Sequence, residues 1–165
     1  MPLDDQKELF IVVDENDKII GYRTRSECHN DKSLIHRGIG VVVFNTEGKI
    51  LLQKRSKQKD LFPGYYSIST GGHVTKGETY LQGAKRELFE EIGVKTRVQL
   101  KTKFIIRSER ETEIDTIYSA IYNGSFKLDN SEVERVEFFS PFQIKKMMQK
   151  LTPFAIKSLK ALNVL

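Results

Sequence analysis

One short segment limits the fold of this chain more than any other, the stretch from Glu78 to Gly93. Apolar residues recur along it at spacings of three and four, namely Leu81, Ala84, Leu88 and Ile92. Such a period is typical of an α-helix that buries one face. Gly93 suits the left-handed backbone conformation that ends many helices. The segment therefore predicts a helix with these four side chains turned toward a core.

Three glutamates lie on one flank of this predicted helix. Glu87, Glu90 and Glu91 stand at positions i, i+3 and i+4, which makes them neighbours on the helix surface. Such like charges repel by about 0.2–0.5 kcal/mol per pair. A Mg²⁺ ion would remove the conflict, because it binds carboxylate, water and phosphate oxygens. Glutamate-rich helix faces are also common as plain solvated surfaces, so the flank alone leaves both interpretations open.

The residues around the helix favour the metal site. The spacing is Gly72, five residues, Glu78, seven residues, and then Arg86-Glu87-Leu88-Phe89-Glu90-Glu91-Ile92-Gly93-Val94. This segment resembles the signature box of the nudix hydrolase family at every defining position. The resemblance implies an α+β fold, an α/β/α sandwich with a mixed central sheet and a loop-helix-loop metal site. It also implies a MutT-like, Mg²⁺-dependent pyrophosphatase, with Mn²⁺ as an alternative ion, that cleaves a diphosphate linkage with metal-activated water.

The same resemblance assigns roles to individual residues. The implied metal ligands are three carboxylates and one backbone carbonyl: Glu87, Glu90, Glu91 and Gly71. One of the glutamates would also be the general base, and the motif does not say which. Arg86 would orient a glutamate through a charge-assisted hydrogen bond. The positions that hold the loop and helix in shape are Gly72, Glu78 and Gly93.

A narrower resemblance extends from about Leu9 to Phe139 and points to the isopentenyl-diphosphate isomerase-like branch of the family. Its implied second metal site comprises three histidines and an acidic pair: His29, His36, His73, Glu113 and Asp115. Imidazole and carboxylate ligands suit Mn²⁺ or Zn²⁺. The basic residues that match the isomerases' diphosphate-binding positions are Arg25, Arg55 and Lys59.

Isomerase activity is one alternative, but the chain departs from the isomerases at a central position. They use a cysteine for proton transfer, where this chain has Gly71, and Cys28 comes too early to replace it. The chain has no tryptophan, so Phe154 is the substitute for their shielding aromatic. A further alternative is a domain that binds a nucleotide or RNA without turnover, which the complete set of glutamates argues against. Hydrolysis is favoured, with isoprenoid, nucleoside and sugar diphosphates all open as substrates.

The rest of the chain predicts a single domain over residues 1–165, because no repeat or linker divides it. An N-terminal hairpin is expected at about 9–24. Strands follow at 36–44, 49–54, 66–70, 95–106, 114–122 and 136–139, the motif at 72–94, and helices at about 141–163.

Composition places this domain among soluble proteins. A single cysteine and the absence of an apolar run near 18 residues predict a reducing, cytoplasmic location without a membrane span. The net charge of +5 favours an anionic ligand. Because the basic residues are scattered, we expect a small-molecule diphosphate as the partner and not nucleic acid. Nothing in the sequence indicates the oligomeric state.

Overall fold

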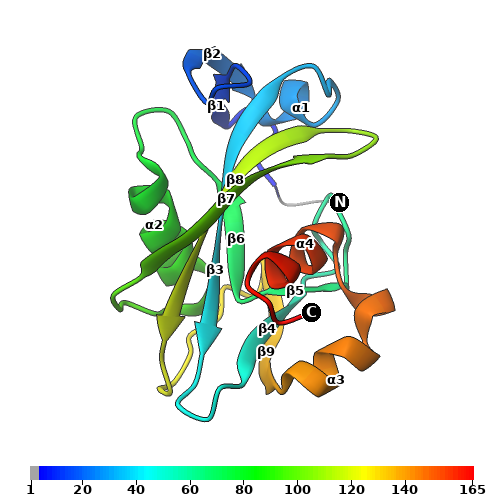
Figure 1. Ribbon diagram of the computed structural model, residues 1–165. Coiled ribbons are helices and arrows are strands. Elements are labelled where there is room, and N and C mark those ends of the chain that lie inside the picture. The colour runs from blue at the N-terminus through cyan, green and yellow to red at the C-terminus, as the bar shows by residue number, and fades with distance from the viewer. Residues whose placement is uncertain (1–3) are drawn as a thin grey trace.

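A computed structural model describes residues 4–165 and arranges strands between helices (Figure 1). The strands are β1 (Leu9–Val13), β2 (Ile19–Thr24), β3 (Ile35–Phe44), β4 (Ile50–Arg55), β5 (Tyr66–Ile68), β6 (Thr70–His73), β7 (Gln99–Arg107), β8 (Thr112–Ile121) and β9 (Val133–Phe139). The helices are α1 (Arg25–Cys28), α2 (Tyr80–Ile92), α3 (Pro141–Lys146) and α4 (Pro153–Ala161), with a 3-10 turn, η1, at Met148–Lys150. Within the described part of the chain, no helix is long and apolar enough to cross a membrane.

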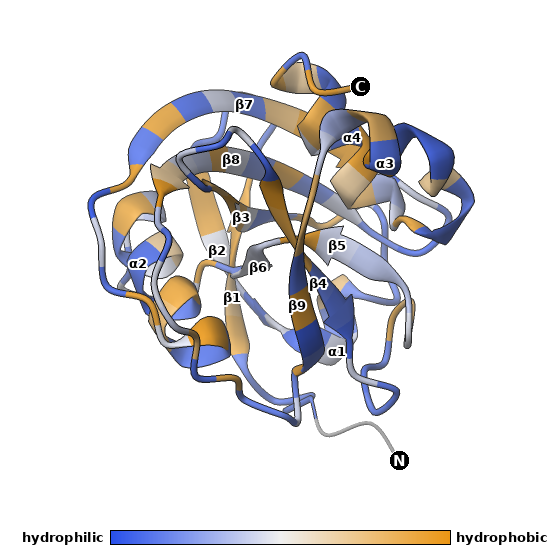
Figure 2. Cartoon of the chain, turned by 90° about the horizontal axis from the view of Figure 1, so that it is seen from below, coloured by the Kyte–Doolittle hydropathy of each residue, from blue (hydrophilic) through white to orange (hydrophobic). Residues whose placement is uncertain are grey.

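Strand β3 organises the sheet. It pairs antiparallel with β1, β4 and β6, and it runs parallel to β8 along its whole length. Its side chains alternate between the two faces, so Ile39 and Val41 pack with the α2 side of the core and Val42 with the α4 side. Both β1 and β3 are largely hydrophobic in Figure 2, as expected for strands inside a layered core. The predicted mixed sheet between helices is confirmed.

Helix α2 begins two residues later than predicted. Thr79 is its N-cap and forms a capping box with Gln82, which leaves Glu78 in the preceding loop. The expectation that Leu81 turns inward is wrong, because its side chain is 42% exposed. Gly83 lies on the buried face instead, next to Val74 of the neighbouring loop.

The glycine pair at 71 and 72 lies inside a strand. We expected one strand at 66–70 that ended at these glycines, but the structure has β5 and β6, with Gly71 opposite Gly40 and Gly72 opposite Ile39. A Cβ atom at Gly72 would lie 2.5 Å from Cδ of Glu87. The lack of a side chain therefore lets α2 bring a carboxylate against the strand.

The end of α2 provides a stability prediction. Gly93 has φ 71°, and a Cβ there would lie 2.8 Å from Cβ of Lys127, whereas Gly48 has φ 78° with open space around it. We expect Gly48→Ala to lower the free energy of unfolding by about 1–2 kcal/mol through backbone strain alone. Gly93→Ala should cost about 1–3 kcal/mol more through the added clash. Urea unfolding of both variants measures the difference, and equal losses would contradict this account.

Candidate metal and substrate site

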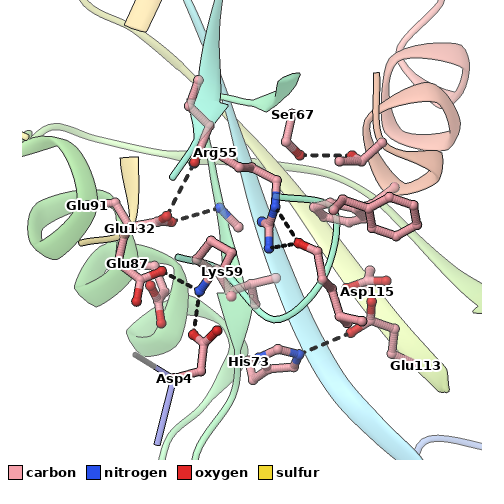
Figure 3. Close-up of a pocket in the computed structure, with 18 of the residues that line it drawn as sticks. Asp4, Arg55, Lys59, Ser67, His73, Glu87, Glu91, Glu113, Asp115 and Glu132 are labelled. Atoms are coloured by element: carbon pink, nitrogen blue, oxygen red, sulfur yellow. Dashed lines mark hydrogen bonds and ion pairs between the residues drawn. The ribbon is translucent and has the colours of Figure 1, made fainter. Parts of the chain in front are cut away.

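A cavity of about 470 Å³ lies where α2, β6, β8 and the N-terminal end of α4 meet. Carboxylates from several elements face it, together with a smaller number of basic side chains (Figure 3). Glycines in β3 and β6 leave room for these groups above the sheet. The cavity is lined by residues that are far apart in the chain, from Asp4 to Phe154.

Glu91 is fixed at one wall of the cavity. Its side chain accepts hydrogen bonds from the Thr70 hydroxyl, the Gly71 N–H at 3.0 Å and Nε2 of Gln53 at 3.2 Å. The residue is only 4% exposed. Burial raises the pKa of its carboxyl group, although these hydrogen bonds oppose the shift.

Glu87 lies against Gly72, one helical turn before Glu91. Nη1 of Arg86 donates to its carboxylate at 2.6 Å. Burial first, and the charge of Glu91 second, raise the pKa of Glu87 to about 8. Two neighbouring carboxyl groups, one buried and one partly buried, that hinder each other's ionisation are a favourable place for a cation, and such perturbed groups in a cavity are typical of functional sites.

Arg86 ties the loop before α2 to the helix. It donates two hydrogen bonds to Glu78 at 2.6 and 2.9 Å, one to the carbonyl of His73 at 3.0 Å, and one to Glu90 at 3.2 Å. The bonds to Glu78 are the main reason why the pKa of Arg86 is raised. Glu90 differs from Glu87 and Glu91, because its side chain is 54% exposed at the rim.

The three histidines of the chain meet at the other end of the same cavity wall. Together with Glu111 they offer four ligand atoms within 4.8 Å of one another: His29, His36, His73 and Glu111. Oε2 of Glu111 lies 2.9 Å from Nε2 of His29 and 3.4 Å from Nε2 of His36. His36 is fully buried, and neither of its ring nitrogens has a hydrogen-bond partner among the described residues. Buried nitrogens without partners fit a metal ion, which would satisfy them.

The structure brings Glu111 and Glu113 to the imidazoles, whereas we expected Glu113 and Asp115. In the parallel register of β3 and β8, Glu113 stands beside His36 and Asp115 beside Gly38, two residues further from the histidines. The carboxyl group of Asp115 lies over Gly38 and contacts no histidine within the described part of the chain. The alternation of acidic residues at 111, 113 and 115 was a signal for Glu111 that the sequence contained, because alternate residues of an extended segment point to the same side; Glu111 directly precedes β8.

The three predicted phosphate-binding residues also reach the cavity. Arg25 pairs with Asp60 at 3.2 Å and with Asp4 at 3.4 Å. Lys59 lies 2.5 Å from Asp4 and from Glu132. Arg55 donates two hydrogen bonds to the carbonyl of Leu61, at 3.1 and 2.8 Å. Sequence reasoning missed Asp4 and Glu132, because no local motif marks them.

An aromatic ring covers the position where the isomerases carry cysteine. A Cβ at Gly71 would lie 2.9 Å from Cε1 of Phe154, and one at Gly40 would lie 2.8 Å from Cζ of the same ring. Phe154 therefore packs over two glycines of adjacent strands. This ring occupies the space that a side chain at position 71 would need.

The fold and this motif define a class of protein, and comparison with known proteins agrees. The family model of the NUDIX domain matches residues 34–162. The chain belongs to the Nudix family. Within it, the chain is 31% identical over 158 residues to an uncharacterized Nudix hydrolase of Pseudomonas aeruginosa, a match that covers 95% of this chain and 92% of that protein.

The isomerase-like branch appears among the relatives as well, as expected. Isopentenyl-diphosphate delta-isomerase 2 of Homo sapiens is 38% identical over 129 residues, which is 74% of this chain but only 55% of that protein. Of solved structures, DR0079 from Deinococcus radiodurans has a TM-score of 0.76 at 22% identity and covers 95% of this chain and 97% of its own. The NUDIX domain of Shewanella oneidensis NrtR, in complex with ADP ribose, has a TM-score of 0.60 at 20% identity and covers 77% and 83%.

Proposed function

We propose that this protein hydrolyses the diphosphate linkage of a phosphorylated small molecule with Mg²⁺ as cofactor. The observation that carries the proposal is the pair of carboxyl groups of Glu87, which is partly buried, and Glu91, which is buried, beside the glycines of β6 and at the wall of a cavity with basic side chains. A binding module has no need for such a pair. A cytoplasmic location, expected from the single cysteine, is part of the same proposal.

The residues that would hold Mg²⁺ are Glu87, Glu91 and the carbonyl of Gly71, with Glu90 at the rim. Bound there, Mg²⁺ would neutralise phosphate oxygens and lower the pKa of a water molecule. Arg86 holds the Glu87 carboxylate in place, and the Gly71 N–H and Gln53 fix that of Glu91. An ionised glutamate at this position can take the proton of the attacking water. Glu91, whose carboxylate is fixed by three hydrogen-bond donors at the cavity wall, is our candidate for that base.

The histidine cluster is the proposed second metal site. Its ligands would be three imidazoles and one or two carboxylates: His29, His36, His73, Glu111 and Glu113. Although burial opposes protonation, Glu111 and Glu113 raise the pKa of His36 to about 9. The two carboxylates thus create a negative environment around the imidazole, which favours a bound cation such as Mn²⁺ or Zn²⁺. His73 and Gly72 are neighbours on β6, so this site and the glutamate site would flank one bound substrate.

The basic residues would bind the phosphates, and the apolar end near Phe154 would contact the remainder of the substrate. Nucleoside, sugar and isoprenoid diphosphates all carry the group that Arg25, Arg55 and Lys59 would bind. The ADP ribose bound by the NrtR domain shows that a related fold accepts a nucleotide-type diphosphate. Phosphate release from a panel of these three classes, with and without Mg²⁺, tests the proposal. Absence of release from every class would contradict it.

Isomerase activity predicts conversion of isopentenyl diphosphate without phosphate release, and the packing of Phe154 argues against it. Restoring the cysteine by Gly71→Cys should yield no isomerisation, because the new side chain meets the Phe154 ring. We expect this substitution to lower the free energy of unfolding by about 1–3 kcal/mol. Its cost should shrink in a Phe154→Ala background, which a double-mutant cycle measures. Formation of dimethylallyl diphosphate by Gly71→Cys would refute this interpretation.

A further inference from the structure

The four Lys and Arg side chains that line the cavity are all engaged with other groups of the protein. Arg86 binds the glutamates of the motif, and Arg55 binds a backbone carbonyl. The remaining two, Arg25 and Lys59, each have a carboxylate of their own, Asp60 and Glu132, and they share a further one, that of Asp4. A substrate phosphate that approached these two cations would therefore meet a negative charge that is already in place.

The surroundings of Asp4 have the pattern of an anion-binding site. Two groups donate hydrogen bonds to its carboxylate, Nζ of Lys59 at 2.5 Å and the N–H of Asp60 at 3.1 Å, and Nη2 of Arg25 lies at ion-pair distance, 3.4 Å. Two cations and a backbone N–H are the groups that typically hold a phosphate in proteins. The side chain of Asp4 is only 4% exposed, so it fills this position and does not merely border it.

The segment that carries Asp4 is fixed just behind it. The N–H of Ser26 donates to the carbonyl of Gln6 at 3.1 Å, and the N–H of Arg25 donates to that of Glu8 at 2.8 Å. Both carbonyls belong to residues that follow Asp4 in the chain. A rotation of the Asp4 backbone and side chain can thus move its carboxylate away from the two cations. The residues that follow Asp4 stay hydrogen-bonded to α1.

We propose that Asp4 occupies, in the substrate-free protein, an anion subsite formed by Arg25, Lys59 and the N–H of Asp60, and that a phosphate of the substrate displaces it. This inference rests on the proposed function, because it assigns the subsite to a diphosphate ligand. Asp4 acts as an internal competitor. Together with Asp60 and Glu132 it neutralises Arg25 and Lys59 when no substrate is bound, and it weakens substrate binding by the free energy needed to displace it.

Asp4→Asn removes the competing charge and should tighten anion binding. We expect the Kd of inorganic pyrophosphate, measured by calorimetry with Mg²⁺, to fall by about fivefold, which is the size of one ion pair of this kind. The KM of the best diphosphate substrate should fall by a similar factor, with kcat within about twofold of the unmodified protein. An unchanged or raised Kd would overturn the proposal, because Asp4 would then position Lys59 and not compete with the ligand.

Two matched variants distinguish the effect of the Asp4 contact with Arg25 and Lys59 from the effect of a change in net charge. Asp5→Asn removes the same charge one residue away and should leave the Kd of pyrophosphate unchanged, whereas Asp4→Glu keeps the carboxylate and should bind like the unmodified protein. An equal gain from Asp5→Asn, or a gain from Asp4→Glu, would refute a specific role for Asp4. If Asp4→Asn melts at a lower temperature, Asp4→Ala provides the same measurement. Tighter pyrophosphate binding without any hydrolysis would reject the proposed function and keep this inference.

Discussion

Replacing Glu91 by glutamine is expected to abolish Mg²⁺-dependent phosphate release. The carboxylate is buried and held by Thr70, Gly71 and Gln53 at the cavity wall. A neutral amide in the same place can neither take a proton from water nor supply a charged metal ligand. Loss of a general base alone lowers kcat by roughly 10²–10⁴-fold. Steady-state kinetics with a responsive diphosphate, over a range of Mg²⁺ concentrations, measures the loss.

Glu90→Gln is the matched control for this experiment. Glu90 lies on the same helix, but it is half exposed and pairs with Arg86 at the rim. We expect a loss of at most about tenfold, in line with a ligand that stays in contact with solvent. Glu91→Gln should lower the free energy of unfolding by at most about 1–3 kcal/mol, since it removes a charge that burial disfavours, the amide oxygen can still accept the Gly71 N–H, and only the hydrogen bond from Gln53 loses its acceptor. A kcat for Glu91→Gln within tenfold of the unmodified enzyme would contradict the proposed role.

The parts of the fold that follow from local chemistry could be predicted from the sequence. The apolar period, the stop at Gly93 and the glutamate spacing of α2 depend only on residues within a few turns of one another. The outward orientation of Leu81 could not be predicted in this way, because the apolar period alone places it on the core side. Both Leu81 and Gly83 are compatible with the helix, and which of them faces the core depends on how α2 packs against β6 and against β3, a strand that is distant in the chain.

The site was predictable only where its residues belong to a motif. Choosing between Glu111 and Asp115 requires the register of β8 against β3, which places Glu113 beside His36. Register is a long-range property, and a shift of two residues keeps every side chain on the same face. Asp4 lies 55 residues before Lys59, and no local pattern in the sequence marks the ion pair between them. Partners of this kind become visible only when the chain is folded.

Zinc or manganese should raise the melting temperature strongly through the histidine cluster. The four groups come from the C-cap of α1, β3, β6 and the turn between β7 and β8, so an ion bound by them would tie these elements together. An ion present at 1,000 times its Kd stabilises a folded protein by about 4 kcal/mol. For a domain of this size that corresponds to a rise of about 10 °C. Thermal unfolding of chelator-treated protein, with and without the added ion, measures the shift.

His36→Asn should remove this shift, because His36 is fully buried at the centre of the cluster and an amide cannot replace its imidazole as a ligand. The substitution can lower stability by itself, so the relevant quantity is the difference that the ion makes within each variant. Glu91→Gln should keep the part of the shift that comes from the histidine cluster, since Glu91 is a proposed ligand of the other metal site. A shift that survives His36→Asn, or one that disappears in Glu91→Gln, would show that the ion binds at the glutamates and that the histidines form no metal site of their own.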